Sequence, residues 1–288
     1  MKLSIHQAFQ FPRSLILSNR RSRTLTIISL CVLVLSILLL GTQISSKAGL
    51  EIDLLSQNQP PSFTHPFGTD WLGRDMLTRT LHGLSFSLTI GLLTAICSAV
   101  IALAIGTISA TMGGKVDALL VWIIDVFLSL PHLVLIILVA FAVGGGVQGV
   151  FIAITLTHWM NLARLLRAEV LQLRSSDYVQ LSAKLGHSPL WIARHHMLPH
   201  IVPQFLVGLV LLFPHAILHE AGLTFLGLGL PPETPAIGII LSEAMRYLSA
   251  GYWWLAVLPG VALLIAVQTF DILGQSLRAL LDPKTSQG

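Results

Sequence analysis

The sequence predicts an all-α, polytopic membrane protein with six transmembrane helices, and three observations carry that prediction. Apolar residues make up 54% of the 288 residues and charged residues only 10%, whereas soluble domains carry about 25% charged residues. Six stretches are apolar and long enough to cross the roughly 30 Å hydrocarbon core as helices. The Lys and Arg residues lie mostly on alternate connections between them. The net charge of +4 does not indicate nucleic-acid binding, because these basic residues form no single patch.

The predicted spans follow one another along the chain with connections of very different length. They are residues 24–42, 84–112, 119–143, 147–168, 201–229 and 252–275. The apolar run 25–41 in the first span is too long for a signal peptide and lacks a small-x-small cleavage site, so we interpret it as an anchoring helix. The second and fifth stretches are longer than a straight span requires, which predicts tilt or extension beyond the bilayer.

The distribution of basic residues orients these helices. With the N-terminus inside, the outer connections are 43–83, 144–146 and 230–251, and they are poor in basic residues. The basic residues that they do contain are Lys47, Arg74, Arg79 and Arg246. All the others lie on the inner side, so the positive-inside rule predicts that both termini are cytoplasmic.

The orientation divides the chain into five parts. They are a cytoplasmic tail (1–23), the first transmembrane helix (24–42), an extracytoplasmic connection (43–83), a five-helix core (84–275) and a second cytoplasmic tail (276–288). The core contains a long cytoplasmic loop, 169–200, between its third and fourth helices.

This inner loop has an amphipathic pattern of its own. Apolar residues alternate with polar ones, Gly186 interrupts the first stretch, and Pro189 is suited to the first turn of a second helix. The pattern predicts two short helices at the inner membrane surface. A basic amphipathic linker lying on anionic lipid is the alternative interpretation.

The loop also resembles the "EAA" loop of ABC importer permeases, with a glycine and a Leu-Pro pair at the expected spacing. The resemblance implies that its short helix docks in a groove of a cytoplasmic ATPase and transmits the motion of that subunit. The residues expected to couple in this way are Gln180, Ala183, Gly186, Leu198 and Pro199. The chain departs from the family at Gln180, where Glu is usual, so the charge of that Glu is absent.

Two outer motifs narrow the resemblance to the peptide/nickel branch of these permeases. The string 65–75 (HPFGTDWLGRD) is rich in turn formers: its glycines predict bends, Asp70 and Asp75 are potential helix caps, and Arg74 is a potential partner for an acid. The run 221–229 (AGLTFLGLG) resembles the same branch, and its small residues favour close helix packing in lipid. The ending, 271–283, is also similar, and the resemblance covers nearly the whole chain from residue 60 onward.

The resemblance implies an ABC importer type I permease in a bacterial cytoplasmic (inner) membrane. Expected partners are a second permease subunit in a heterodimer, two cytoplasmic ATPase subunits, an extracytoplasmic substrate-binding protein and membrane lipid. The chain has no Gly-x-x-x-x-Gly-Lys-Ser/Thr loop. We therefore expect no enzymatic activity and no tightly bound cofactor, with ATP used by the partner subunit.

Histidines within the predicted spans give information about which substrate is transported. His215 and His219 are four residues apart, on one face of the fifth span, at a spacing that allows both imidazoles to contact one metal ion. With His158 and Glu220 they are the candidate residues of the translocation path, because polar groups in a bilayer face the bundle interior or a water-filled cavity. The His-x-x-x-His pattern resembles nickel-type permeases, and we expect transient metal contact at His215 and His219.

The preferred cargo is therefore nickel or a related metal, free or held by a small chelator, and the alternative is a dipeptide or oligopeptide. A proton-coupled secondary transporter using Glu220 and the histidines is less favoured, since it leaves the structured inner loop without a role. An intramembrane metalloenzyme is disfavoured because the sequence has no His-Glu-x-x-His motif.

Overall fold

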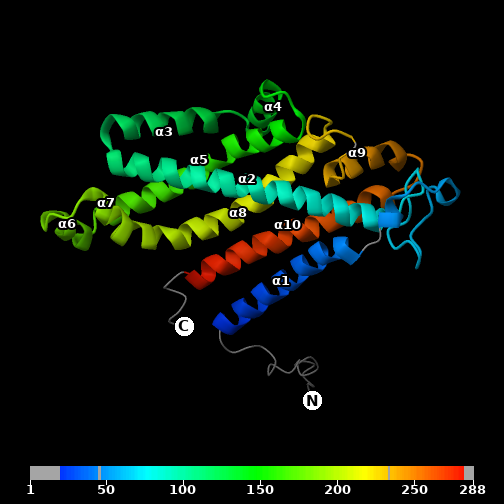
Figure 1. Cartoon of the computed structure of the whole chain (residues 1–288), viewed down its shortest axis with the longest axis horizontal. Coiled ribbons are helices and arrows are strands. Elements are labelled where there is room, and N and C mark those ends of the chain that lie inside the picture. The colour runs from blue at the N-terminus through cyan, green and yellow to red at the C-terminus, as the bar shows by residue number, and fades with distance from the viewer. Residues whose placement is uncertain (1–19, 45–46, 233, 282–288) are drawn as a thin grey trace, which may run out of the picture.

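The computed structural model describes residues 20–44, 47–232 and 234–281, and over these ranges it contains helices and no strand. The helices form an elongated bundle in which most axes run along its length (Figure 1). Besides the N-terminal helix, four helices are long and apolar enough to cross a membrane, and a bent pair of helices gives a sixth candidate span if it is counted as one. The predicted all-α architecture with six spans is confirmed. Much of the two predicted tails (1–23 and 276–288) and part of the C-terminal motif lie outside the described residues.

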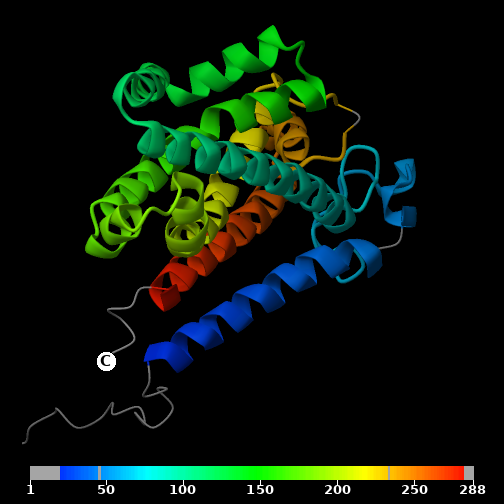
Figure 2. The same cartoon turned by 60° about the vertical axis from the view of Figure 1, so that its left-hand side comes forward.

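The first helix, α1 (Arg20–Ile44), lies at the edge of the bundle beside α10 (Trp254–Leu281) (Figures 1 and 2). Only 12% of the most apolar 18-residue stretch of this helix is buried against the rest of the protein, and Leu30, Leu33 and Ile37 are exposed. In a bilayer this surface meets lipid tails, and the helix satisfies its own backbone hydrogen bonds.

The centre of the bundle is made by α2 (Met76–Met112), α5 (Gly146–Arg174), α8 (Leu198–Phe225) and α10. The second predicted span, 84–112, lies within a longer helix, since α2 begins at Met76. The Asp75 carboxylate caps this helix by accepting a hydrogen bond from the Thr78 backbone N–H at 2.8 Å. The fourth span also continues past its predicted end at residue 168, to Arg174.

The predicted single helix over 119–143 is replaced by two helices. They are α3 (Gly114–Ser129) and α4 (His132–Ala142), and their axes differ by 101°. The break falls at Leu130-Pro131, where Leu130 is extended, with ψ 144°. Proline disfavours the helical conformation in the residue before it and cannot donate a backbone hydrogen bond, so the chain turns there.

The inner loop folds as two short helices, as its pattern predicts. The first is α6 (Asp177–Lys184), and the second is α7 (Pro189–Ile192). Between them Gly186 adopts φ +88°, which glycine tolerates best. The Ser188 side chain caps α7 by accepting from the Trp191 backbone N–H at 3.2 Å. A π-helical turn, Ala193–Met197, then leads directly into α8.

The described parts of the connections predicted to lie outside contain short helices as well. Residues after α1 form two short 3-10 helices, η2 (Lys47–Leu50) and η3 (Leu54–Ser56), followed by a loop closed against α2. The segment between α8 and α10 contains α9 (Ile237–Leu248). These elements gather at the opposite end of the bundle from α6 and α7 (Figure 1).

Candidate functional site

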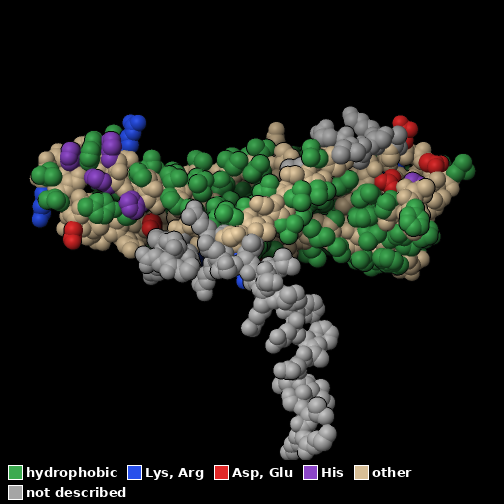
Figure 3. Space-filling view, turned by 90° about the horizontal axis from the view of Figure 1, so that it is seen from below, with side chains coloured by type: hydrophobic (Ala, Val, Ile, Leu, Met, Phe, Trp, Pro, Cys, Tyr) green, Lys and Arg blue, Asp and Glu red, His purple; other side chains and the backbone are tan. Residues whose placement is uncertain are grey.

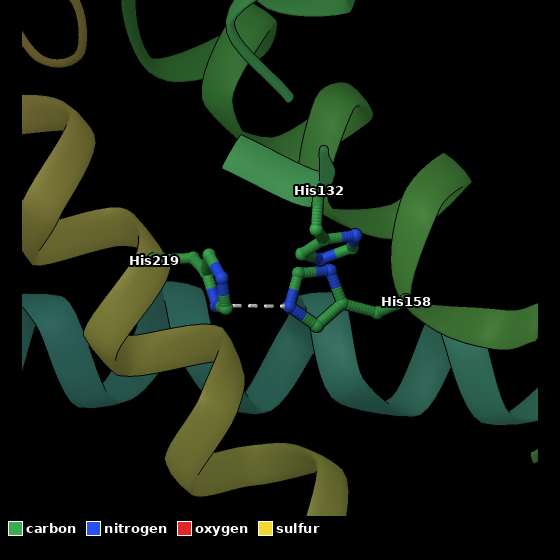
Figure 4. Close-up of side chains that lie close together, drawn as sticks. All are labelled: His132, His158 and His219. Atoms are coloured by element: carbon green, nitrogen blue, oxygen red, sulfur yellow. Dashed lines mark hydrogen bonds between the residues drawn. The ribbon is translucent and has the colours of Figure 1, made fainter. Parts of the chain in front are cut away.

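Three histidines from three different helices meet within the bundle. His132 is the first residue of α4, His158 lies in α5, and His219 lies in α8 (Figure 4). One ring nitrogen from each lies within 4.8 Å of those of the other two. The ring centroids are 4.8 to 4.9 Å apart, and the rings meet edge to face. We call this group the three-histidine cluster.

Backbone carbonyls select the tautomers of two of these rings. His158 Nδ1 lies 3.0 Å from the Ile154 carbonyl oxygen, and His219 Nδ1 lies 2.7 Å from the His215 carbonyl oxygen. Because a carbonyl only accepts, each Nδ1 carries the proton in these bonds, and Nε2 keeps a lone pair in the neutral ring. The contact between His158 Nε2 and His219 Nδ1 is longer, at 3.4 Å (Figure 4).

The cluster lines a cavity of about 220 Å³ between α3, α4, α5 and α8. His215 lines the same cavity, so the sequence-predicted path residues His158, His215 and His219 share one site. His158 is buried, His219 is half-buried and His215 is exposed. Asn161 is the other strongly polar side chain in the wall, which is otherwise mainly apolar.

Two features of this site differ from the sequence expectations. The close group contains His132 in place of His215, so the two histidines expected to share a metal belong to different parts of the wall. Sequence reasoning missed His132 because it assigned that residue to the interior of one continuous helix. Pro131 was the available signal, since it predicts a break that turns the start of α4 inward.

Glu220 is not brought to the cavity. Its side chain is fully buried, and Thr224 donates a hydrogen bond to its Oε1 at 3.1 Å. The carboxyl group therefore lies among packed helices, although it neighbours His219 in the sequence.

The residues expected to couple to an ATPase lie at the α6–α7 end. Gln180, Ala183 and Gly186 are exposed there. Leu198 and Pro199 are also exposed, but they open α8 and do not belong to the loop. Figure 3 shows histidine, Lys and Arg side chains gathered at this end, whereas acidic side chains occur at both ends. Two of these histidines, His187 and His195, stack on the ring of Trp191. Their ring centroids lie 3.9 and 4.4 Å, respectively, from the Trp191 centroid.

A network of ion pairs holds the outer end together. The buried Asp70 carboxylate accepts from Arg74 Nε at 2.8 Å and from Arg79 Nη1 at 2.7 Å. Arg79 also reaches Glu243 of α9 at 2.8 Å, which ties the loop before α2 to the segment before α10. The expected pairing role of Arg74 is confirmed. Nearby, hydrogen bonds from the Ser56 hydroxyl and the Leu55 N–H lower the pKa of the Asp53 carboxyl.

Comparison with known proteins identifies the class of this architecture. Residues 102–287 match the family described as "Binding-protein-dependent transport system inner membrane component". The dipeptide transport system permease protein DppC of Bacillus subtilis is 34% identical over 245 residues, covering 85% of this chain and 77% of that protein. The oligopeptide transport system permease protein OppC of the same organism is 35% identical over 266 residues, covering 92% and 87%.

Solved structures agree on the fold. A chain of the MetNI methionine ABC transporter, in inward-facing conformations, superposes with a TM-score of 0.59 at 20% identity, covering 72% of this chain and 98% of that one. The family match and the relatives define the class as that of transport permeases, and the fold agrees with it. The chain belongs to the family of binding-protein-dependent transport system inner membrane components.

Proposed function

We propose that the chain is one of two membrane-spanning subunits of an ATP-driven peptide importer and forms half of its translocation path. The observation that carries the proposal is the similarity to permeases named for dipeptides and oligopeptides, which extends over 85% and 92% of the chain. The peptide alternative thus replaces nickel as the preferred cargo, because the relatives that match most of the chain are named for peptides.

The cavity beside the bend between α3 and α4 is the best candidate for a part of the path in this subunit. It has polar groups at membrane depth, including His158, His215 and His219, and polar groups inside a bilayer mark substrate pathways. Glu220 has a different role in this proposal. Its buried carboxyl group, bonded to Thr224, holds the outer end of α8.

The partners follow from the two ends of the bundle. Cytoplasmic ATPase subunits would dock at α6 and α7, a binding protein would dock on the outer connections, and a second permease would complete the path. Both termini are then cytoplasmic, which agrees with the basic side chains at the α6–α7 end. A proton-coupled mechanism would leave the exposed α6–α7 surface without a partner.

Uptake measurements in cells test this function. Cells lacking the chain are complemented with it, alongside the complete set of partner subunits, and offered radiolabelled dipeptide and radiolabelled nickel in parallel. We expect dipeptide uptake that requires the chain and ATP and survives a protonophore when ATP is kept constant. Uptake that collapses with the proton gradient at constant ATP, or accumulation of free nickel without dipeptide, would refute the proposal.

Replacing Gly186 with valine tests coupling through the inner loop. A β-branched residue at φ +88° costs about 1–2 kcal/mol, and no neighbouring atom blocks the side chain, so the strain falls on the α6–α7 turn itself. We expect a several-fold fall in peptide uptake per ATP hydrolysed by the assembled transporter. The matched control is Gly251→Val, which places the same strain, at φ +91° and also in open space, at the outer end. Equal transport per ATP in the two variants would argue against docking at this loop.

A further inference from the structure

We propose that the three-histidine cluster of His132, His158 and His219 is a binding site for a divalent transition-metal ion. The site goes beyond peptide transport, and its use in transport rests on the proposed function. Three protein ligands leave coordination positions open. The amine or carboxylate of a peptide can fill them, so the imported species would be a metal–peptide complex.

The spacing of the rings fits one ion after small side-chain rotations. Imidazole nitrogens bind zinc at about 2.0–2.1 Å, which places two ligands of a tetrahedral site roughly 3.3 Å apart. One ring nitrogen of each histidine already lies within 4.8 Å of those of the other two. Rotation about the side-chain bonds of the three histidines would close the remaining gap around an ion.

The hydrogen bonds of the rings are those of metal ligands. A ligating histidine almost always donates its other ring N–H to a carbonyl or carboxylate, which sets the tautomer and aims the lone pair. The carbonyl groups of Ile154 and His215 hold His158 and His219 in this way. The Nδ1 proton of His219 is donated to the His215 carbonyl oxygen, which is the shorter of its two contacts. The 3.4 Å contact to His158 therefore adds little stability to the metal-free cluster.

A purely structural role accounts poorly for the cluster. Among the residues that the structure describes, the His132 ring makes ring contacts with the other two histidines and no hydrogen bond. Polar groups in a membrane protein are costly unless they are paired or face a cavity. Leucine or phenylalanine at the start of α4 would pack without that cost. Access is also available, because His132 and His219 are only half-buried and line the cavity.

The ligand set limits the metals. Imidazole nitrogen suits zinc, copper, nickel and iron, whereas calcium and magnesium require oxygen ligands. No carboxylate lines the described cavity wall, since Glu220 is directed into the helix packing. The site is thus expected to discriminate strongly against hard cations.

Metal binding to the complete transporter in lipid nanodiscs tests the site, with purification through a tag that contains no histidine. Co²⁺ is the probe, because its visible absorption reports nitrogen coordination, and Ni²⁺ and Zn²⁺ are tested in competition with it. The variants are His132→Gln, His158→Gln, His219→Gln and the triple change. The control is His200→Gln, an exposed histidine near the α6–α7 end.

We expect one Co²⁺ ion per chain, at least about tenfold weaker binding in each single variant, and no change in the control. His132→Gln lies at the start of its helix, so it keeps the test informative if the triple variant does not assemble. Binding and spectra unchanged in the assembled His132→Gln and His158→Gln variants would overturn the site and indicate adventitious binding at other histidines.

Parallel dipeptide uptake separates this inference from the proposed function. Peptide uptake by a wild-type transporter that binds no Co²⁺ would reject the metal site and leave the peptide importer intact. Specific Co²⁺ binding without any peptide uptake would leave the site standing and reject the proposed cargo. If the cargo is a metal–peptide complex, chelator treatment lowers wild-type peptide uptake to the level of the His158→Gln variant.

Discussion

Asp70→Ala is expected to destabilise the outer end of the permease by about 3 kcal/mol, because Arg74 loses its ionic partner and Arg79 keeps only Glu243. The Asp70 side chain is 0% exposed, and the Arg79 side chain is 11% exposed. Asp70 also accepts hydrogen bonds from the backbone N–H groups of Leu72 at 2.8 Å and Arg74 at 2.9 Å, so the substitution removes the centre of the loop. Thermal unfolding of the solubilised transporter should shift down by on the order of 10 °C.

Two further variants show which interaction matters. Asp70→Asn keeps an oxygen for the backbone N–H groups but loses the charge, so its melting temperature should lie between those of the wild type and Asp70→Ala. Asp70→Ala combined with Arg79→Met and Glu243→Gln removes the pair without leaving Glu243 as an unpaired charge, and it should recover part of the loss. A melting temperature for Asp70→Ala equal to that of the wild type would show that the ion pairs contribute nothing to the fold.

Gly106→Ala is expected to destabilise the contact between α2 and α5 by about 1–3 kcal/mol, although alanine favours helix formation. A Cβ atom at this position would lie 2.7 Å from the Ala163 carbonyl oxygen and 3.2 Å from the Arg167 backbone nitrogen. Because these are backbone atoms, the two helices must separate to admit the methyl group. The separation would also disturb the ion pair between Arg167 and Asp117, whose Nη2 and Oδ2 atoms are 2.6 Å apart.

Gly222→Ala is the matched control. Gly222 is also in a long helix, but a Cβ atom there would meet nothing within 4 Å. Alanine should therefore leave the melting temperature unchanged or raise it slightly, through helix propensity alone. Fluorescence-detected size-exclusion chromatography after heating measures both variants. A similar response of the two glycines would contradict the assignment of close packing to Gly106.

The local parts of the fold were predictable because their signals are local. Composition and the length of apolar stretches predict membrane spans, and the pattern around Gly186 and Pro189 predicts two short helices. Asp75 is recognisable as a potential cap, whereas the apolar pattern alone indicates a membrane span only from residue 84. The first turns of α2 contain polar residues such as Arg79, so their composition does not predict a membrane span. A cap and an ion pair stabilise these turns as part of the helix.

The cavity at the three-histidine cluster could not be predicted from local sequence patterns. Helical periodicity placed His215 and His219 on one face, and both line the same cavity. It gave no information about the neighbouring helices, so it paired these two residues with each other. It also grouped Glu220 with them, whereas the structure turns that side chain into the packed interior.

The sequence by itself determined that the chain is a helical membrane protein, where most of its spans lie and which family of permeases it resembles. Only the tertiary structure decided which histidines come together. The reason is physical: a 101° bend at Leu130-Pro131 brings His132, far away along the chain, beside His158 and His219. Contacts between helices depend on how whole helices bend and pack, and no local pattern of residues contains that information.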